Sequence, residues 1–158
     1  MNKYRTHNCS ELSEGDIDKE VTLSGWLHRK RDHGNLLFID IRDHFGITQC
    51  VIENNNKSFT VIEKARPESV MKISGKVVKR SSGTENKELK TGKIEVSIKS
   101  VEILSNAKEL PIPVFGEQDY PEDIRLKYRF LDLRRDEMHK NIILRSKVIS
   151  FIRTEMIK

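Results

Sequence analysis

The sequence predicts a mainly β fold: a five-stranded barrel with one helix between its third and fourth strands, followed by an extended linker and a C-terminal helix. Three observations predict it. Runs of alternating apolar and polar residues fill most of the first hundred positions. One segment among them has apolar residues at helical spacing, and so does a second segment of about twenty residues at the end. A length of 158 residues fits one domain with a short appendage.

The first three predicted strands form a meander. The first alternates over residues 21–28, and the basic segment 29–35 is predicted to interrupt it as a turn. The second strand is predicted at 36–42 and the third at 47–52, with a turn at 43–46 between them. Strands that follow one another through such short turns pair as neighbours.

A short helix and two long strands complete the predicted barrel. Apolar residues at near-helical spacing predict the helix at 59–65, which ends before Pro67. The strands are predicted at 70–80 and 94–101, joined by the polar loop 81–92. This element order is expected of an OB-fold, a Greek-key barrel that binds oligonucleotides. A small β-sandwich is the alternative, and the helix favours the barrel.

The rest of the chain changes character. Three prolines and a glycine between residues 105 and 123 indicate a linker, and apolar residues recur on one face of a predicted helix from 136 onward. We therefore expect the barrel domain at 1–106, a linker or hinge at 107–135 and a helix at 136–158. The absence of a helix stop signal indicates a longer parent protein, with a docking C-terminal helix as the alternative.

Composition excludes several functional classes. The formal net charge of +5 suits a polyanionic partner. Because the chain has neither an apolar run of spanning length nor a signal-type N-terminus, we expect a cytoplasmic protein with no membrane contact. Cys9 and Cys50 are too few for a disulfide framework or a four-ligand metal site, and we expect both to be reduced and chemically quiet.

Catalytic motifs are absent as well, including a phosphate-binding glycine loop, a nucleophile elbow and a zinc-protease helix. The pair Asp40 and Asp43 could hold a metal or act as acid and base. The intervening Arg42 instead favours an ion-paired hairpin. The sequence thus predicts no catalytic and no metal-binding residue.

The candidate binding surface lies on the polar side of the second strand. Phe38 shares that face with polar residues, where it can stack on a base or cover a minor core under a loop. Arg29 and Arg31 beside it, with Arg80 at the end of the fourth strand, would form a basic rim around the ring. Taken singly, the charges fit a solvated hairpin tip, and the combination favours single-stranded nucleic acid over a protein-docking barrel.

Two further residues are ambiguous from pattern alone. Glu95 faces outward from the fifth strand, where it can accept hydrogen bonds from a base or balance Lys93. Gln49 alternates in register with Ile47 and Val51, which would turn it inward unless a bulge intervenes. Its direction stays open at this point.

Several segments together resemble the first part of bacterial aspartyl-tRNA synthetases, which are class II enzymes. They are Gly25-Trp26, Arg29-Lys30-Arg31-Asp32-His33-Gly34, Leu37-Phe38-Ile39-Asp40-Ile41-Arg42-Asp43, Gly46-Ile47-Thr48-Gln49 and Arg125-Leu126-Lys127-Tyr128-Arg129-Phe130-Leu131-Asp132-Leu133-Arg134-Arg135. The resemblance runs from about residue 3 to the end of the chain.

This resemblance implies an anticodon-binding barrel, a hinge and the opening helix of a class II catalytic domain. A full-length parent would use ATP and Mg²⁺ to join aspartate to tRNA(Asp), and its relatives are homodimers through the catalytic domain. The later motifs for ATP, aspartate and Mg²⁺ are missing here. The 158 residues should therefore hold no cofactor and be inactive in aminoacylation.

The resemblance also assigns roles to single residues. Phe38 matches an aromatic that stacks on the central anticodon base, and Gln49 matches a residue that hydrogen-bonds that uridine. Arg31 matches a basic anticodon contact, Glu95 a carboxylate that reads the first base, and Arg80 a basic residue near the third. The loop 81–90 departs from the family pattern.

His33 stands where relatives carry Leu or His, and the choice is associated with charging tRNA(Asp) alone or tRNA(Asn) as well. His33 therefore predicts an enzyme that serves both. The rival hypothesis is a stand-alone OB-fold module that binds single-stranded nucleic acid.

Overall fold

The computed structural model describes residues 3–116 and 119–157 and divides into two compact units, the first up to Lys108 and the second from Glu109. The remaining residues belong to the N-terminus, the predicted linker and the end of the predicted C-terminal helix, and lie outside the described residues. The elements in chain order are η1 (Glu14–Asp16), β1 (Glu20–Asp32), β2 (Leu36–Arg42), β3 (Ile47–Glu53), α1 (Phe59–Lys64), β4 (Val70–Lys79), β5 (Ile94–Ser105), α2 (Glu122–Lys127), α3 (Arg129–Asp132) and α4 (Asp136–Ile157).

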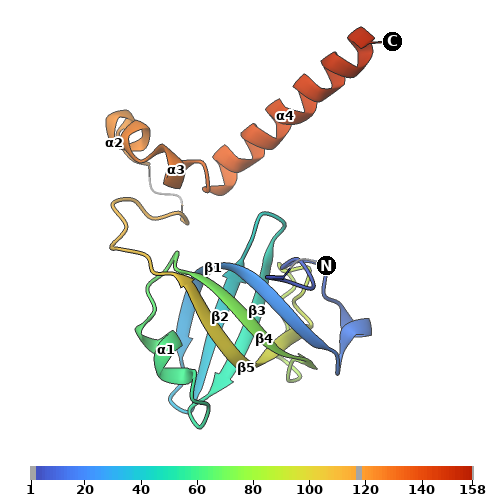
Figure 1. Cartoon of the computed structure of the whole chain (residues 1–158), viewed down its shortest axis with the longest axis vertical. Coiled ribbons are helices and arrows are strands. Elements are labelled where there is room, and N and C mark those ends of the chain that lie inside the picture. The colour runs from blue at the N-terminus through green and yellow to red at the C-terminus, as the bar shows by residue number, and fades with distance from the viewer. Residues whose placement is uncertain (1–2, 117–118, 158) are drawn as a thin grey trace. The chain divides into compact units, whose positions relative to one another are not determined.

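Five strands close into a barrel in the order β1-β2-β3-β5-β4 (Figure 1). Every pairing is antiparallel except the one between β3 and β5, which is parallel and joins Cys50 to Val96 and Val51 to Ser97. We call these two residue pairs the seam. The predicted OB-fold barrel, with α1 between its third and fourth strands, is confirmed.

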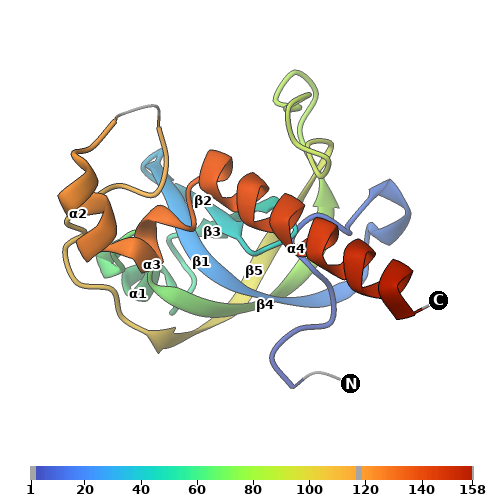
Figure 2. The same ribbon diagram turned by 90° about the horizontal axis from the view of Figure 1, so that it is seen from above.

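β1 is long because it serves two neighbours. Residues 20–26 pair with β4 and residues 26–32 pair with β2, and the strand curves between them (Figure 2). The register shifts between Leu27 and Arg29. Near this bend a Cβ on Gly25 would lie 2.3 Å from the carbonyl oxygen of Arg42, so only glycine allows the two backbones this close.

The prediction of a basic turn at 29–35 is wrong for residues 29–32, which belong to β1. Arg29 and Arg31 lie within β1, because the register shift lets the strand continue along β2. Only His33, Gly34 and Asn35 form the turn, where Gly34 has a φ of +73° and its amide donates to Asp32 Oδ1 over 2.8 Å. Lys30 also belongs to the predicted basic segment. Its Nζ donates to carbonyl oxygens at the end of α1, so Lys30 is not part of the candidate site.

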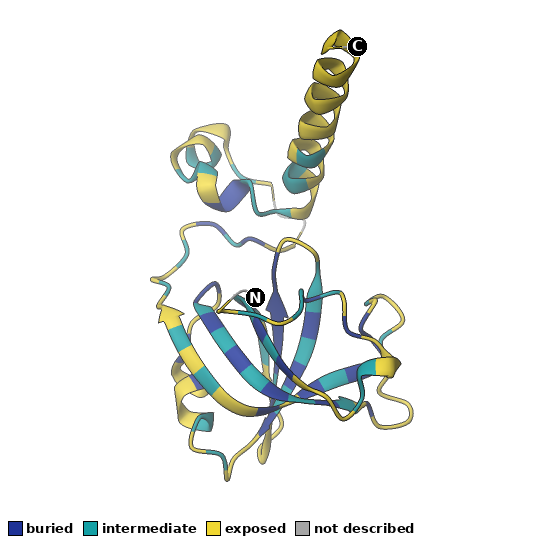
Figure 3. Cartoon of the chain, turned by 45° about the vertical axis from the view of Figure 1, so that its right-hand side comes forward, coloured by how far each residue is buried: buried dark blue, intermediate teal, exposed yellow. Residues whose placement is uncertain are grey.

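Buried residues that fill the barrel alternate with more exposed ones along most of the strands, except at the end of β2, where residues 39–42 are all buried (Figure 3). The largest fully buried side chains of this core are Leu12, Leu23, Leu27, Leu37, Ile39, Ile41, Ile52, Ile62, Met71, Ile73 and Ile94. Cys9 and Leu12 show that the segment before β1 also packs on this core. The sequence offered no periodic signal for that segment.

Both cysteines are free thiols without solvent exposure. Burial is the main cause that raises the pKa of Cys9 and of Cys50, so neither forms the reactive thiolate readily. We expect iodoacetamide at about pH 8 to modify neither thiol in the folded chain and both after denaturation in urea. Mass spectrometry of the two samples measures this, and labelling of the native chain at the denatured rate would contradict it.

The second unit has its own small core of Ile112, Val114 and Leu131. The predicted C-terminal helix is confirmed as α4, but its apolar residues do not keep to one face. Leu144 and Phe151 lie on the side of the helix opposite Ile142 and Ile149, and all four are exposed. The expectation of one apolar stripe is therefore wrong, since the sequence interleaves apolar residues on both sides.

Two features are absent from the described residues. No helix there is both long enough and apolar enough to cross a membrane. No cluster of three or more His, Cys, Asp or Glu side chains in the same residues could hold a metal ion.

Candidate nucleic-acid interface

The strand register brings the predicted site residues to one outer face of the barrel. Arg29 of β1 lies opposite Asp40 of β2, which lies opposite Gln49 of β3. The seam then places Glu95 of β5 beside Gln49, because the residues that follow them, Cys50 and Val96, are paired. Side chains from four strands thus meet in one line across the sheet.

Hydrogen bonds connect four of these side chains into what we call the polar row: Arg31, Asp40, Gln49 and Glu95. Arg31 Nη2 donates to Asp40 Oδ1 and to Gln49 Oε1, each over 3.0 Å. Gln49 Nε2 donates to Glu95 Oε2 over 2.7 Å. Each strand of β1, β2, β3 and β5 contributes one member, so the folded barrel holds the row in place.

The polar row settles the direction of Gln49, which faces outward and is half-buried. Ile47 and Val51 share this outer side, because Thr48, Cys50 and Ile52 form the inner face of β3. Thr48 has no exposed surface even though it is polar. Its hydroxyl donates to the carbonyl oxygen of Cys9, which satisfies the buried group.

Phe38 lies next to the polar row. It is half-buried on β2, opposite Arg31 on one side and Val51 on the other. The His33 ring meets it edge to face, with centroids 5.4 Å apart and planes at 89°. His33 and Arg29 are exposed. An aromatic ring beside arginines and hydrogen-bonding groups is the arrangement that single-stranded nucleic acid binding requires.

Arg80 does not belong to an open basic rim, which corrects the prediction. It directly follows β4 and is only 4% exposed. Its Nε donates to the carbonyl oxygen of Ile94 over 3.0 Å, whereas its Nη2 is buried without a hydrogen-bond partner. Burial lowers the pKa of Arg80, and the nearby carboxylates of Glu95 and Asp40 act against that shift. The guanidinium therefore lies beneath the face, close to the row.

The two aspartates of β2 and its turn are ion-paired, as expected, but not with Arg42. Asp40 pairs with Arg31, and Asp43 Oδ2 lies 3.3 Å from Arg5 Nη1. Asp43 also accepts hydrogen bonds from the backbone amides of Phe45 and Gly46 in the turn and of Cys9 in the N-terminal segment. Its carboxylate is thereby committed to holding the turn and the N-terminal segment.

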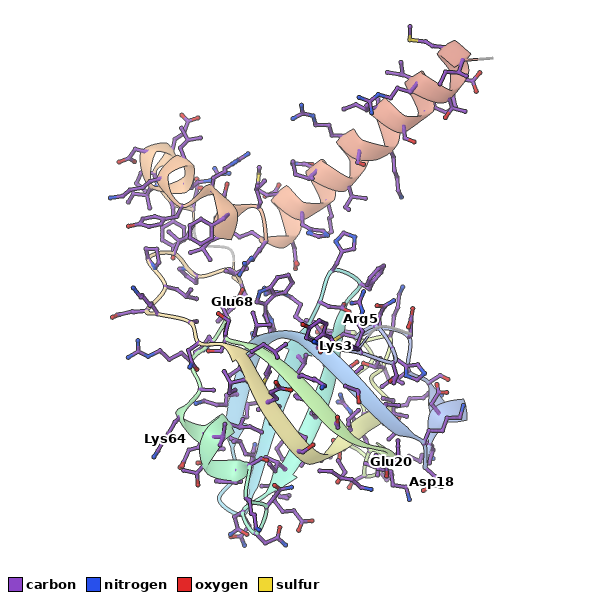
Figure 4. The ribbon with its side chains drawn as sticks, in the orientation of Figure 1. Lys3, Arg5, Asp18, Glu20, Lys64 and Glu68 are labelled. Atoms are coloured by element: carbon purple, nitrogen blue, oxygen red, sulfur yellow. The ribbon has the colours of Figure 1, made fainter. Side chains whose placement is uncertain are left out.

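Arg42 forms a separate buried pair. Its Nη2 lies 2.7 Å from Glu68 Oε1, and both side chains are almost fully buried. The guanidinium also contacts His28 Nδ1 at 2.9 Å and lies 5.7 Å from the centre of the Trp26 ring. Figure 4 shows Glu68 at the end of the barrel where β4 begins, away from Glu20 at the other end.

The pKa of Asp40 is raised, which is unusual for an ion-paired acid. Burial raises the pKa of its carboxyl above the ordinary 3.8, although Arg31, Arg29 and Arg80 all act to lower it. When the pKa of a carboxyl is higher in the folded chain than in the unfolded chain, the protonated group stabilises the fold. This contribution is complete at pH values below the pKa of the unfolded chain. It is lost as the pH rises through the pKa of the folded chain. Ionised Asp40 therefore costs stability.

We expect the stability of the wild-type chain relative to Asp40→Asn to fall between about pH 3.5 and about pH 7, because only the wild type loses this contribution. Urea midpoints of both chains at the two pH values measure the change. A relative stability that rises with pH would show that Arg31 outweighs burial.

The closed five-stranded barrel defines an OB-fold, and sequence comparison agrees. Residues 21–104, more than half of the chain, match the family described as the OB-fold nucleic acid binding domain. The chain belongs to that family. Residues 121–158 match the family of class II tRNA synthetases (D, K and N).

Several similar proteins are named aspartate–tRNA(Asp/Asn) ligase. The protein from Pelagibacter ubique is 63% identical over all 158 residues, and the one from Beijerinckia indica is 58% identical over 99% of the chain. The chain spans 27% and 26% of their lengths, about a quarter. These matches confirm the resemblance inferred from the sequence.

Solved structures show the same fold. Asparaginyl-tRNA synthetase from Pyrococcus horikoshii matches 96% of the chain and 35% of its own, with a TM-score of 0.80 and 27% identity. Aspartyl tRNA synthetase from Entamoeba histolytica matches 94% of the chain and 36% of its own, with a TM-score of 0.82. At 19% identity the second match supports the fold alone.

Proposed function

We propose that this chain binds the anticodon loop of tRNA as part of an aspartate–tRNA ligase. The observation that carries the proposal is the polar row beside Phe38, because it combines a stacking surface with ordered donors and acceptors on one face. The relatives are named for aspartate and for tRNA(Asp/Asn), and these names support tRNA as the ligand and aspartate as the amino acid. RNA loops are read in this way, by stacking of splayed bases and hydrogen bonds to their edges.

Each member of the face then has a role. Phe38 stacks on the central anticodon base, and Gln49 hydrogen-bonds its edge. Glu95 accepts from the first base, for which guanine offers suitable donors. Arg31 contacts the loop directly. Arg80 lies near the third base, where its buried guanidinium contributes positive charge beneath the face. Arg29, exposed on β1, attracts backbone phosphate.

The ligation itself belongs to the whole protein in this proposal. Class II synthetases use ATP and Mg²⁺, and the described residues contain no acidic or histidine cluster that fits a metal ion. We place both cofactors, the aspartate site and the homodimer contact of the parent outside the barrel, and the working compartment in the cytoplasm. The 158-residue chain should bind RNA without aminoacylating it.

His33 extends the proposal to the third anticodon base, which is C in tRNA(Asp) and U in tRNA(Asn). The relatives are named for both tRNAs. A neutral imidazole can donate at one nitrogen and accept at the other, so it tolerates the amine of C and the carbonyl of U. We expect His33→Leu to weaken binding of a GUU hairpin by about 1–2 kcal/mol while a GUC hairpin changes less. Equal losses for both hairpins would contradict this role.

Fluorescence anisotropy with labelled hairpins tests the proposed function. The chain should bind a seven-nucleotide loop carrying GUC more tightly than the same hairpin with a scrambled anticodon. Equal affinity for both hairpins and for single-stranded DNA would instead favour the stand-alone module. Detectable aspartate-dependent pyrophosphate exchange would overturn the claim that the chain is inactive.

A further inference from the structure

Asp40 is an acid in the middle of a face that the proposed function assigns to RNA. Its side chain is mostly buried and lies in the central part of β2, so the strand fixes its position. An acid near phosphates weakens their attraction, and burial of this one also costs stability. Neither general charge nor stability explains an ionised carboxyl here.

The contact that Asp40 makes is with Arg31. Arg31 Nη2 bridges Asp40 Oδ1 and Gln49 Oε1, both at 3.0 Å, while 41% of the Arg31 side chain is exposed. A long side chain with this exposure has many rotamers, and a fixed carboxylate restricts them. Asp40 therefore anchors the guanidinium that holds the Gln49 amide.

The Gln49 amide has only one orientation in this arrangement. Its Oε1 accepts from Arg31, and its Nε2 donates to Glu95. A flipped amide would set its NH₂ group against the guanidinium and its oxygen against the carboxylate, so both contacts would become unfavourable. One lone pair on Oε1 and one N–H on Nε2 then remain for a ligand.

That orientation matters because uracil and cytosine present opposite patterns. Uracil offers an N3–H donor beside the O4 acceptor, whereas cytosine offers the N3 acceptor beside the N4 amine. A glutamine amide satisfies either base if it can rotate. A glutamine fixed between Arg31 and Glu95 satisfies only one of them, and the proposed function assigns that one to uracil.

We propose that Asp40 is a positioning residue for base selection: by anchoring Arg31 it locks the Gln49 amide and makes the face prefer uracil over cytosine at the central anticodon position. The inference rests on the proposed function. It assigns to Asp40 a role that its charge alone would oppose.

Two variants separate positioning from charge. Asp40→Asn and Asp40→Ala remove the same negative charge, but only asparagine keeps an oxygen that accepts from Arg31. We measure affinities of the 158-residue chain for two hairpins whose loops differ only in a central U or C. The ratio of the two affinities should be highest for wild type, intermediate for Asp40→Asn and about tenfold below wild type for Asp40→Ala. A pure charge effect predicts tighter binding of both hairpins by both variants, with an unchanged ratio.

Glu53→Gln is the matched control. Glu53 is an exposed acid at the end of β3 whose carboxylate accepts from Asn55 Nδ2, so its replacement removes one charge without touching the polar row. Its ratio should equal that of wild type. Circular dichroism and thermal melts accompany each variant, and if Asp40→Ala fails to fold, the near-isosteric Asp40→Asn decides the outcome.

The same data distinguish two failures. A wild-type chain without preference for U over C overturns the proposed reading of the central base, and this inference with it. A wild type that prefers U, with Asp40→Asn and Asp40→Ala that keep the full ratio, overturns only the positioning role. In an Arg31→Ala background, Asp40→Ala should change the ratio no further, because Asp40 acts through Arg31.

Discussion

Replacement of Glu68 by alanine is expected to lower the free energy of unfolding of the barrel by about 3 kcal/mol. The substitution leaves Arg42 buried without the carboxylate that lies 2.7 Å from it. Contacts with His28 and Trp26 remain, but neither carries a compensating negative charge. An uncompensated buried cation is among the most destabilising changes that a single substitution makes.

Two control variants test whether loss of the Glu68 carboxylate causes this destabilisation. Glu68 has a φ of +65°, which is strained for any residue with a Cβ, so Glu68→Gly removes the same carboxylate but regains about 1 kcal/mol of backbone strain. The exposed pair of Lys72 and Glu102 links β4 to β5 at 3.5 Å, and Glu102→Ala should cost less than about 1 kcal/mol.

Urea unfolding followed by far-ultraviolet circular dichroism gives these free energies. Fluorescence serves as a second probe, because Trp26 is the only tryptophan of the chain and lies in β1. If Glu68→Ala costs no more than Glu102→Ala, the buried pair contributes nothing beyond an exposed one.

Replacement of Phe38 by alanine is expected to weaken binding of the GUC hairpin by about 1–3 kcal/mol, or about 5- to 150-fold. The ring is half-buried on the outer face, so its removal takes away a stacking surface and leaves the barrel core intact. The thermal midpoint should therefore change little. A large loss of stability with unchanged affinity would show that Phe38 covers a minor core instead.

Phe45→Ala is the control for a general loss of aromatic surface. Phe45 is 51% exposed in the turn between β2 and β3, where its ring lies 5.6 Å from the Arg5 guanidinium. It takes no part in the polar row, and its removal should leave RNA affinity unchanged. Equal effects at both positions would mean that Phe38 binds RNA without specificity.

Alternation predicted most of the fold, because each strand has one face in the core and one outside. The faces of β2 illustrate this: Leu37, Ile39 and Ile41 are buried and Phe38 is on the other side, as the pattern indicated. Pattern failed where a tertiary contact changes the meaning of a residue. Thr48 reads as polar and exposed, yet a hydroxyl contact with Cys9, 39 positions away, makes it part of the core.

The candidate site shows the same limit. Strand polarity and the family resemblance predict the residues of the site but not their contacts with one another. The pattern places Arg31 in a turn because a bulge leaves no periodic signal. It places Arg80 on a rim because Arg80 follows the end of a strand, and it gives no sign that the side chain is buried. The contact between Asp40 and Arg31 is not predicted either, although the place of Asp40 on the same polar face as Phe38 is a usable signal.

The seam has a consequence for how the barrel and its ligand influence each other. Gln49 and Glu95 are 46 positions apart in the chain, and they meet because two residue pairs join β3 to β5. Local opening of so short a parallel pairing would separate them and divide the polar row in two. An RNA base that contacts both sides therefore binds only the closed barrel and adds its binding free energy to closure. We therefore expect RNA binding and closure of the barrel at the seam to stabilise each other.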